Sequence, residues 1–248
     1  MSTPLPRPTS ADGLFLWVLH RFAEVFEEHA VLKGGIALRL YDCPRSTTDV
    51  DYVFVPFRSK TEIVGRIERV LREVDGAKVH IAAHSKMVRA SLQIEGVGIQ
   101  IEANVSQECD STAMPTADFA RSLGQPSRIV RVMAPDTSLA HKLAAWNERR
   151  LLRDLYDAWF LSTRIGAKPD RAVLDKRLGK IESRHPAVAG KKKMKRAEFA
   201  AELRAAAESI DERAMRQELA PLLPPGELPG LLPRLRGAIV RLAEQLET

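Results

Sequence analysis

Segments of strand-type composition stop near residue 134, and this change constrains the fold more than any other feature of the chain. Before it, short β-branched and aromatic runs stand at 50–55, 77–82, 87–94 and 98–105, beside amphipathic helical patterns at 14–29 and 60–74. After it, nearly every segment has helix-forming composition. We therefore expect an α+β fold, in which a mixed sheet flanked by helices is followed by a C-terminal helical domain.

The same patterns divide the chain into three parts. A proline-rich lead over 1–11 is expected to be disordered, because it lacks the basic start and apolar core of a signal peptide. We expect an α/β domain over 12–134 and a helical domain over 135–248 that completes the active site. Five prolines and two glycines at 221–233 predict a loop before a last helix at 235–246.

Charge and cysteine usage limit the partners and the location. The formal net charge of +6 favours a polyanionic partner such as nucleic acid, or an anionic substrate such as a triphosphate. The two cysteines, Cys43 and Cys109, show neither metal-type spacing nor a disulfide framework, so a reducing, cytoplasmic location is expected. No run approaches the roughly 18 apolar residues that a membrane span needs, and no membrane partner is expected.

An acidic pair at the mouth of an apolar strand is the main chemical signal. Lys33-Gly34-Gly35 is followed, after thirteen intervening residues, by Asp49-Val50-Asp51. Residues i and i+2 of a strand point to the same side, so the two aspartates can converge on a divalent cation that neutralises them. Glycines let the backbone approach a phosphate chain closely. Each piece is weak alone, since a D-x-D is more often a turn or a solvated strand end.

A third carboxylate strengthens the interpretation. In the alternating segment 99–105, Gln100, Glu102 and Asn104 share one face of the expected strand. Without the aspartate pair, an exposed polar sheet face would be the preferred reading of this segment. With it, three carboxylates and a glycine turn predict a nucleotide site.

Four blocks in this order resemble one family. They are Lys33-Gly34-Gly35-x-Ala37-Leu38, Arg45-x-Thr47-x-Asp49-x-Asp51, Ile101-Glu102-x-Asn104, and Lys142-Leu143-x-Ala145 with Arg153-Asp154-Leu155-Tyr156-Asp157. Together they resemble the AbiEii/MenT nucleotidyltransferase toxins of bacterial type IV-like toxin–antitoxin systems, within the DNA polymerase β-type nucleotidyltransferase superfamily. The resemblance spans 31–161. Ile36 departs from it, because many relatives carry a hydroxyl residue there.

The resemblance implies a nucleotidyltransferase-type sheet, a role for each residue, and the partners. NTP, the substrate, would be bound by Lys33, Gly34, Gly35, Arg45, Thr47 and Lys142. Mg²⁺ or Mn²⁺ would be held by Asp49, Asp51 and Glu102. Catalytic roles fall on Asp49, Asp51, Glu102, Lys142 and Asp157, with Asp154 as an alternative to Asp157. The acceptor would be RNA, with the tRNA 3′ end as the site that relatives modify to block translation, and a cognate antitoxin would be a further partner.

Helix geometry adds a requirement to the last block. On one straight helix, Lys142 and Asp157 would lie more than about 20 Å apart, too far to share a site. We therefore expect a turn near 147–150, with two antiparallel helices that bring both side chains together.

A basic block in the C-terminal half leaves two interpretations open. It could be a solvated or disordered stretch, or a patch that holds the phosphates of an RNA acceptor. Its members are Lys191, Lys192, Lys193, Lys195 and Arg196.

Two other functions also stay open. A small-molecule nucleotidyltransferase of the aminoglycoside-modifying kind would share the metal centre, although its acceptor pocket would more naturally be acidic. A non-catalytic pseudoenzyme that binds only RNA or a partner protein is the second, and the presence of all three carboxylates and Lys142 argues against it.

Overall fold

The computed structural model describes residues 7–85, 87–183 and 185–247. The chain forms two compact units. The first contains the chain up to Asp42 together with Thr47–Met133, and the second contains Cys43–Ser46 together with the chain from Ala134 onwards. The sequence patterns place a boundary between 134 and 135, but they do not single out Cys43–Ser46. This short segment separates from its neighbours because its contacts are made with the helical unit.

The expected disordered lead falls partly outside the described residues, which begin at Arg7. Arg7 forms an ion pair with Glu95 at 2.9 Å. The Ser10 side chain accepts a hydrogen bond from the backbone N–H of Gly13 and so caps the first helix, which begins at Ala11.

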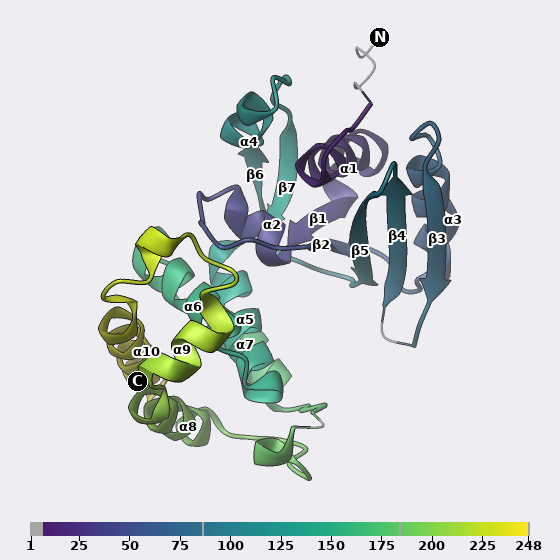
Figure 1. The fold of residues 1–248 in the computed structure, drawn as a ribbon. Coiled ribbons are helices and arrows are strands. Elements are labelled where there is room, and N and C mark those ends of the chain that lie inside the picture. Colours follow the sequence, from purple (N-terminus) through teal and green to yellow (C-terminus); the bar gives the residue numbers. More distant parts are fainter. Residues whose placement is uncertain (1–6, 86, 184, 248) are drawn as a thin grey trace. The chain divides into compact units, whose positions relative to one another are not determined.

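A seven-stranded mixed sheet runs through the described part of the first unit (Figure 1). The strands are β1 Ala30–Lys33, β2 Asp49–Phe54, β3 Lys78–Ala83, β4 Val88–Ile94, β5 Val97–Val105, β6 Ser111–Pro115 and β7 Ile129–Met133. Their order in the sheet is β3-β4-β5-β2-β1-β7-β6. The pairs β2–β5 and β1–β7 are parallel, and the other pairs are antiparallel.

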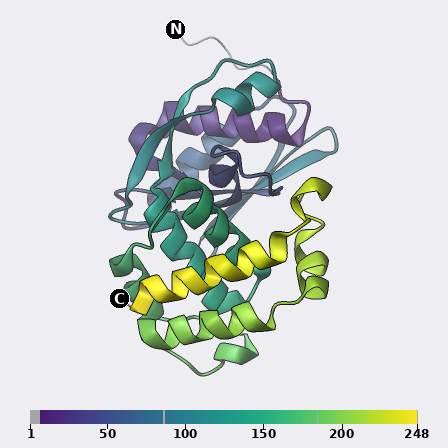
Figure 2. The same ribbon diagram turned by 90° about the vertical axis from the view of Figure 1, so that its left-hand side faces the viewer.

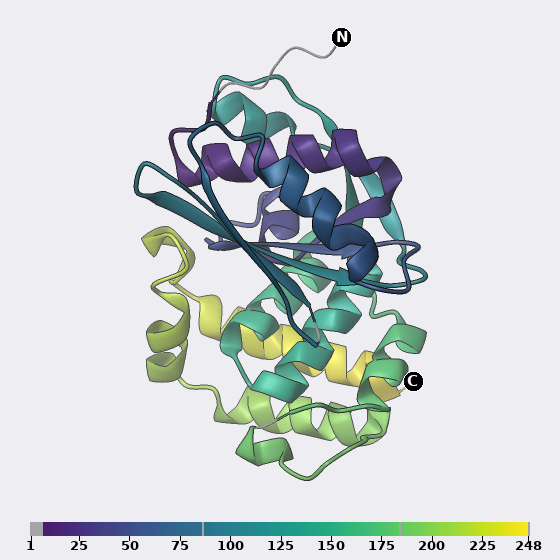
Figure 3. The ribbon, with the colours of Figure 1, turned by 90° about the vertical axis from the view of Figure 1, so that its right-hand side faces the viewer.

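One face of this sheet is covered by α1 Ala11–Phe26 and α3 Thr61–Leu71, which lie over the same side of the strands (Figure 3). Alternation along β2 sends Val50, Tyr52 and Phe54 into the core beneath them. It therefore sends Asp49 and Asp51 to the opposite face. The unit's remaining helices are the 3₁₀ turn η1 Glu27–His29, α2 Gly34–Arg39 and α4 Ala117–Ser122.

The expected mixed sheet flanked by helices is confirmed. The runs at 50–55, 77–82, 87–94 and 98–105 correspond to β2, β3, β4 and β5 with shifts of at most one residue at either end. The sequence patterns did not indicate β6 and β7. Both have only five residues, and β6 ends at Pro115, so neither provides the long alternation on which a strand prediction depends.

The second unit is helical, as expected. It contains α5 Pro135–Arg149, α6 Leu152–Phe160, the π-helical turn η2 Leu161–Ile165, α7 Arg171–Leu178, the 3₁₀ turn η3 Pro186–Val188, α8 Arg196–Ser209, α9 Glu212–Leu219, the 3₁₀ turn η4 Pro225–Glu227 and α10 Leu231–Glu247. Helices α8 and α10 pack side by side (Figure 2), and α5 packs against α6 and α7. Within the described ranges, no helix has both the length and the apolar character needed to cross a membrane.

The last helix begins earlier than the prolines predict. It starts at Leu231, inside the predicted loop at 221–233, and Pro233 lies in its first turn. Proline is tolerated there because the first backbone N–H groups of a helix have no intrahelical acceptor.

The expected break between Lys142 and Asp157 is present. Helix α5 ends at Arg149, Arg150 adopts left-handed backbone angles, and α6 begins at Leu152. This turn reverses the chain, so α5 and α6 pack against each other within the second unit.

Candidate active site

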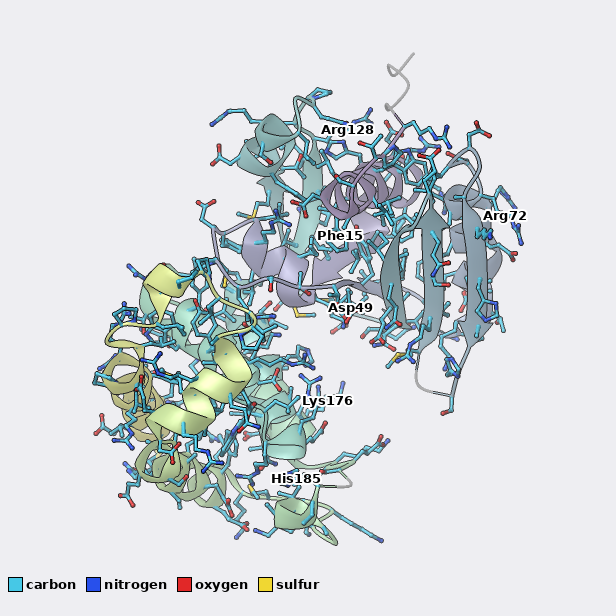
Figure 4. The ribbon with its side chains drawn as sticks, in the orientation of Figure 1. Phe15, Asp49, Arg72, Arg128, Lys176 and His185 are labelled. Atoms are coloured by element: carbon cyan, nitrogen blue, oxygen red, sulfur yellow. The ribbon has the colours of Figure 1, made fainter. Side chains whose placement is uncertain are left out.

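The register of three strands gathers the acidic residues of the first unit. Asp51 on β2 stands opposite Lys33 on β1 and beside Glu102 on the parallel strand β5. Asp49 lies two residues earlier on the same face of β2, at the position labelled in Figure 4. Thr47 precedes the strand, and its hydroxyl donates to the Asp49 carbonyl oxygen at 3.4 Å. The carboxylates predicted from sequence therefore share one strip of the sheet.

Asp51 and Glu102 each contact a cationic side chain. The Lys33 ammonium nitrogen lies 3.4 Å from Asp51 Oδ1, a long contact between side chains about a quarter exposed. Glu102 Oε1 accepts hydrogen bonds from Arg89 Nη2 at 2.7 Å and from Gln100 Nε2 at 3.0 Å. Among the described residues, no three His, Cys, Asp or Glu side chains form a group ready to hold a metal ion. The expected three-carboxylate ligand set is thus not preassembled, and Glu102 is held by other partners.

The Gly34 backbone lies against the Asp51 side chain. Gly34 has φ +75°, and a Cβ added there would lie 2.9 Å from the Asp51 Cβ. Only glycine can combine this left-handed backbone with such a close approach. The β1–α2 turn at Gly34-Gly35 therefore lies against Asp51, and an Asp51 oxygen bound to a cation would stand beside the main chain of this turn.

A second ionic cluster lies inside the helical unit. Asp157 on α6 is fully buried and accepts from Arg45 Nε at 2.7 Å, from Arg45 Nη2 at 3.0 Å and from the Lys142 ammonium at 2.6 Å. Burial by itself would raise the pKa of Asp157, but the charges of Lys142 and Arg45 hold the pKa below its ordinary value of 3.8. Asp157 therefore stays ionised with both oxygens occupied, between two cations.

Asp154 has a different partner, which separates the two aspartates that the sequence left as alternatives. Its buried carboxylate accepts from Arg149 Nη2 at 2.6 Å and from Arg149 Nε at 3.1 Å. The pair joins the end of α5 to the first turn of α6. Asp154 therefore braces the corner between the helices, whereas Asp157 contacts Lys142.

Cys43 lies near the Asp157 cluster in the second unit. Burial, followed by the Asp157 charge, raises the pKa of the Cys43 thiol to about 12. Cys43 is therefore a neutral, unreactive thiol at physiological pH.

The predicted site residues thus fall into two groups, one in each unit. The first unit brings together Lys33, Gly34, Gly35, Thr47, Asp49, Asp51 and Glu102, and the second brings together Arg45, Lys142 and Asp157. The sequence did not point to Arg89, which holds Glu102. The alternation of 88–94 places Arg89 on the polar face of its strand, but its pairing with Glu102 depends on strand register.

The basic block is only partly available to a ligand. Lys191 pairs with Glu198 at 2.9 Å, and Arg196 pairs with Asp175 at 2.9 Å. In the described ranges, no carboxylate forms an ion pair with three exposed members of the block, Lys192, Lys193 and Lys195. Backbone hydrogen bonds anchor the segment, from Ile181 N–H to the Lys192 carbonyl and from Met194 N–H to the Leu178 carbonyl.

Replacing Gly34 by alanine should damage this strip of the sheet. The new methyl group would collide with Asp51, and φ +75° is unfavourable for alanine, so we expect a loss of about 1–3 kcal/mol in the free energy of unfolding. Urea denaturation measures this loss. The matched control is Gly65→Ala in the middle of α3, where nothing lies within 4 Å of the added carbon, and it should be neutral or stabilising. Equal stability of the two variants would contradict the close approach of Gly34 to Asp51.

Replacing Asp157 by asparagine should be strongly destabilising, because it leaves two buried or half-buried cations without their anion. The expected loss is about 3–5 kcal/mol at pH 7. The control Asp175→Asn removes the half-exposed partner of Arg196 and should cost under about 1 kcal/mol.

The Asp157 contribution should also depend on pH. Because its folded pKa lies below 3.8, the contribution is complete above that pH and is lost as the pH falls through the folded value. Chemical denaturation at several pH values measures it. A difference between wild type and Asp157→Asn that grew on acidification would contradict the assignment.

Comparison with known proteins identifies the family. Residues 17–240 match the family of the nucleotidyl transferase AbiEii toxin of type IV toxin–antitoxin systems. No curated protein sequence matches the chain. The chain resembles the structure of MenT4, a nucleotidyltransferase toxin from Mycobacterium tuberculosis H37Rv, with TM-score 0.63 and 17% identity over 94% of this chain and 82% of that one. It also resembles JHP933 from Helicobacter pylori, with TM-score 0.52 and 14% identity over 96% of this chain and 92% of that one.

These structural likenesses show the shared fold, and the family match spans most of the sequence. The resemblance carried by the four sequence blocks is confirmed, and the chain belongs to the AbiEii family of nucleotidyltransferase toxins.

Proposed function

We propose that this nucleotidyltransferase moves a nucleotide from an NTP to the 3′ end of an RNA acceptor, with tRNA as the acceptor to test first. As the toxin of a toxin–antitoxin pair, it would block translation in the cytoplasm until a cognate antitoxin restrains it. The observation that carries the proposal is the position of Asp51 beside the Gly34 backbone, with Asp49 two residues away on the same face of β2. This arrangement suits a metal-bound triphosphate better than any other ligand class.

The donor chemistry fits a divalent cation. Mg²⁺ is usually held by one or two carboxylates together with substrate phosphates, and a complete protein cage is not required. Asp49 and Asp51 would supply these carboxylates, while Gly34 and Gly35 would donate backbone N–H groups to phosphate oxygens. Bound Mg²⁺ or Mn²⁺ would supply Lewis-acid stabilisation of the charge that develops on the phosphates.

The remaining residues have separate tasks in the transfer. Glu102 would accept the proton of the acceptor hydroxyl, whose oxygen forms a bond to the α-phosphorus. The bond from that phosphorus to the bridging oxygen breaks, and pyrophosphate leaves with the electron pair. Lys33 and Lys142 would neutralise charge on the departing phosphates.

Asp157 and Arg45 are positioning residues in this scheme. Asp157 has both oxygens occupied, and its contact with Lys142 fixes the ammonium group on α5. Arg45 shares the carboxylate and balances its charge. Neither residue needs to touch the nucleotide for its loss to impair the transfer.

The basic block supports an RNA acceptor. Three exposed lysines on an anchored segment can contact successive phosphates without first losing acidic partners. The net charge of +6 acts in the same direction.

Replacing either aspartate should abolish transfer. Purified protein is incubated with Mg²⁺, total RNA and each α-labelled NTP in turn, and label in RNA is measured. We expect label in tRNA with the wild type and a loss of at least about 100-fold in Asp49→Asn and in Asp51→Asn. The control Asp118→Asn removes an exposed carboxylate of α4 and should retain wild-type activity.

Two results would contradict the proposal. Label that enters an aminoglycoside and not RNA would support a small-molecule nucleotidyltransferase. NTP binding without incorporation into either acceptor would support a non-catalytic protein.

Removing the exposed lysines should weaken RNA binding without weakening NTP binding. The triple variant Lys192→Ala, Lys193→Ala, Lys195→Ala should lower the slope of log affinity against log salt by about 2, since each single-strand phosphate contact contributes about 0.7. Fluorescence anisotropy with labelled tRNA measures the slope. The charge-matched control changes three exposed cations elsewhere, Arg69, Lys78 and Lys168, to alanine. A similar loss in both triple variants would show that net charge, and not this segment, binds RNA.

A further inference from the structure

A row of four charged residues crosses the sheet at the candidate active site. Strand register aligns Arg89 on β4, Glu102 on β5, Asp51 on β2 and Lys33 on β1. The charges therefore run positive, negative, negative, positive. Adjacent strands are about 4.8 Å apart, so the two central carboxylates repel each other unless a cation lies on each. Lys33 lies on Asp51, and Arg89 lies on Glu102.

The contacts of Glu102 are unequal between its two oxygens. Oε1 accepts from Arg89 Nη2 at 2.7 Å, from Arg89 Nε at 3.2 Å and from Gln100 Nε2 at 3.0 Å. No donor in the described part of the chain contacts Oε2. The guanidinium and the amide thus saturate one oxygen and leave the other to a ligand. The Glu102 side chain is only one-fifth exposed, which restricts its freedom to turn away.

This arrangement separates Glu102 from a cation bound by Asp49 and Asp51. A carboxylate paired with a guanidinium is partly neutralised, so it attracts a cation less strongly than an unpaired carboxylate does, and binding a metal through both oxygens would require it to give up the three hydrogen bonds on Oε1. Lys33 makes one contact at 3.4 Å with Asp51, which a divalent ion can displace more easily. The two central carboxylates therefore differ in availability: Asp51 is open to metal and Glu102 is restrained.

We propose that Arg89, with Gln100, is a positioning residue that ties Glu102 by one oxygen, keeps it out of the metal ligand set and directs Oε2 toward the acceptor hydroxyl. The part of this proposal that concerns the hydroxyl rests on the proposed function. The part that concerns the metal does not, and it can be measured without catalysis.

The chain supplies a matched control for Arg89. Arg72, the residue that directly follows α3, donates from Nη2 at 2.7 Å and from Nε at 3.1 Å to Oε1 of Glu68, which repeats the geometry of the Arg89–Glu102 pair. Arg72, labelled in Figure 4, lies on the helical side of the first unit and has no role in the proposed site. Arg72→Ala therefore removes the same kind of ion pair from an exposed helix surface.

Manganese binding tests the restraint directly. Mn²⁺ affinity is measured by electron paramagnetic resonance for wild type, Arg89→Ala, Glu102→Gln, the double variant and Arg72→Ala. We expect Arg89→Ala to bind Mn²⁺ about tenfold more tightly because Glu102 is released to the metal. Glu102→Gln, the double variant and Arg72→Ala should match the wild type. An unchanged affinity in Arg89→Ala, or a weaker one in Glu102→Gln, would overturn the proposal.

Steady-state kinetics test the second role. We expect Arg89→Ala to lower kcat at least tenfold with KM for NTP unchanged, and Arg89→Lys to restore part of kcat. In the Glu102→Gln background, Arg89→Ala should cause no further loss, because Arg89 acts through Glu102. Additive losses would overturn the positioning role. A wild type without transferase activity would instead refute the proposed function, and the manganese titration would still decide whether Arg89 restrains Glu102.

Discussion

The parallel pairing of β2 with β5 is the constraint on which the candidate site depends. It brings Asp51 and Glu102, fifty-one positions apart in the sequence, to adjacent positions on one face. Two carboxylates at the spacing of neighbouring strands are unfavourable without cations, and the structure provides one from each flanking strand. Two carboxylates thus lie at the centre of this row of side chains, with Lys33 and Arg89 at its two ends. This arrangement suits the binding of a metal ion together with a polyphosphate.

The helical unit stabilises a buried carboxylate in a different way. There a single carboxylate, Asp157, is fully buried between two cations, and α5 and α6 are folded back to bring Lys142 to it. A buried pair of this kind contributes little net stability, but loss of one partner is costly. The pair matters for positioning, because it fixes an ammonium group and holds Cys43–Ser46, which is separated from β2 by two residues, within the second unit.

The position of the aspartate pair and the break between the two helices could be predicted from the sequence, because both follow from local periodicity. Alternation placed Asp49 and Asp51 on one face and indicated β5, and the rise of 1.5 Å per residue required the break at Arg150. The four-block pattern correctly indicated the family.

What escaped prediction depends on register and tertiary contacts. Nothing near Arg89 in the sequence identifies Glu102 as its partner, because a shift of one residue between β4 and β5 would place the two on opposite faces. The sequence also did not show that Arg89 and Gln100 would both donate to Glu102 Oε1. The assignment of Cys43–Ser46 to the helical unit follows from its buried ion pair, which no local pattern reveals.

In the proposed function, Asp49 and Asp51 form half of a metal site that the nucleotide completes. The most direct test is Mn²⁺ titration of the wild-type protein with and without a non-hydrolysable NTP analogue. We expect weak binding of Mn²⁺ alone and binding at least about tenfold tighter with the analogue, since phosphate oxygens supply the missing ligands. Equal affinity in the two titrations would contradict it.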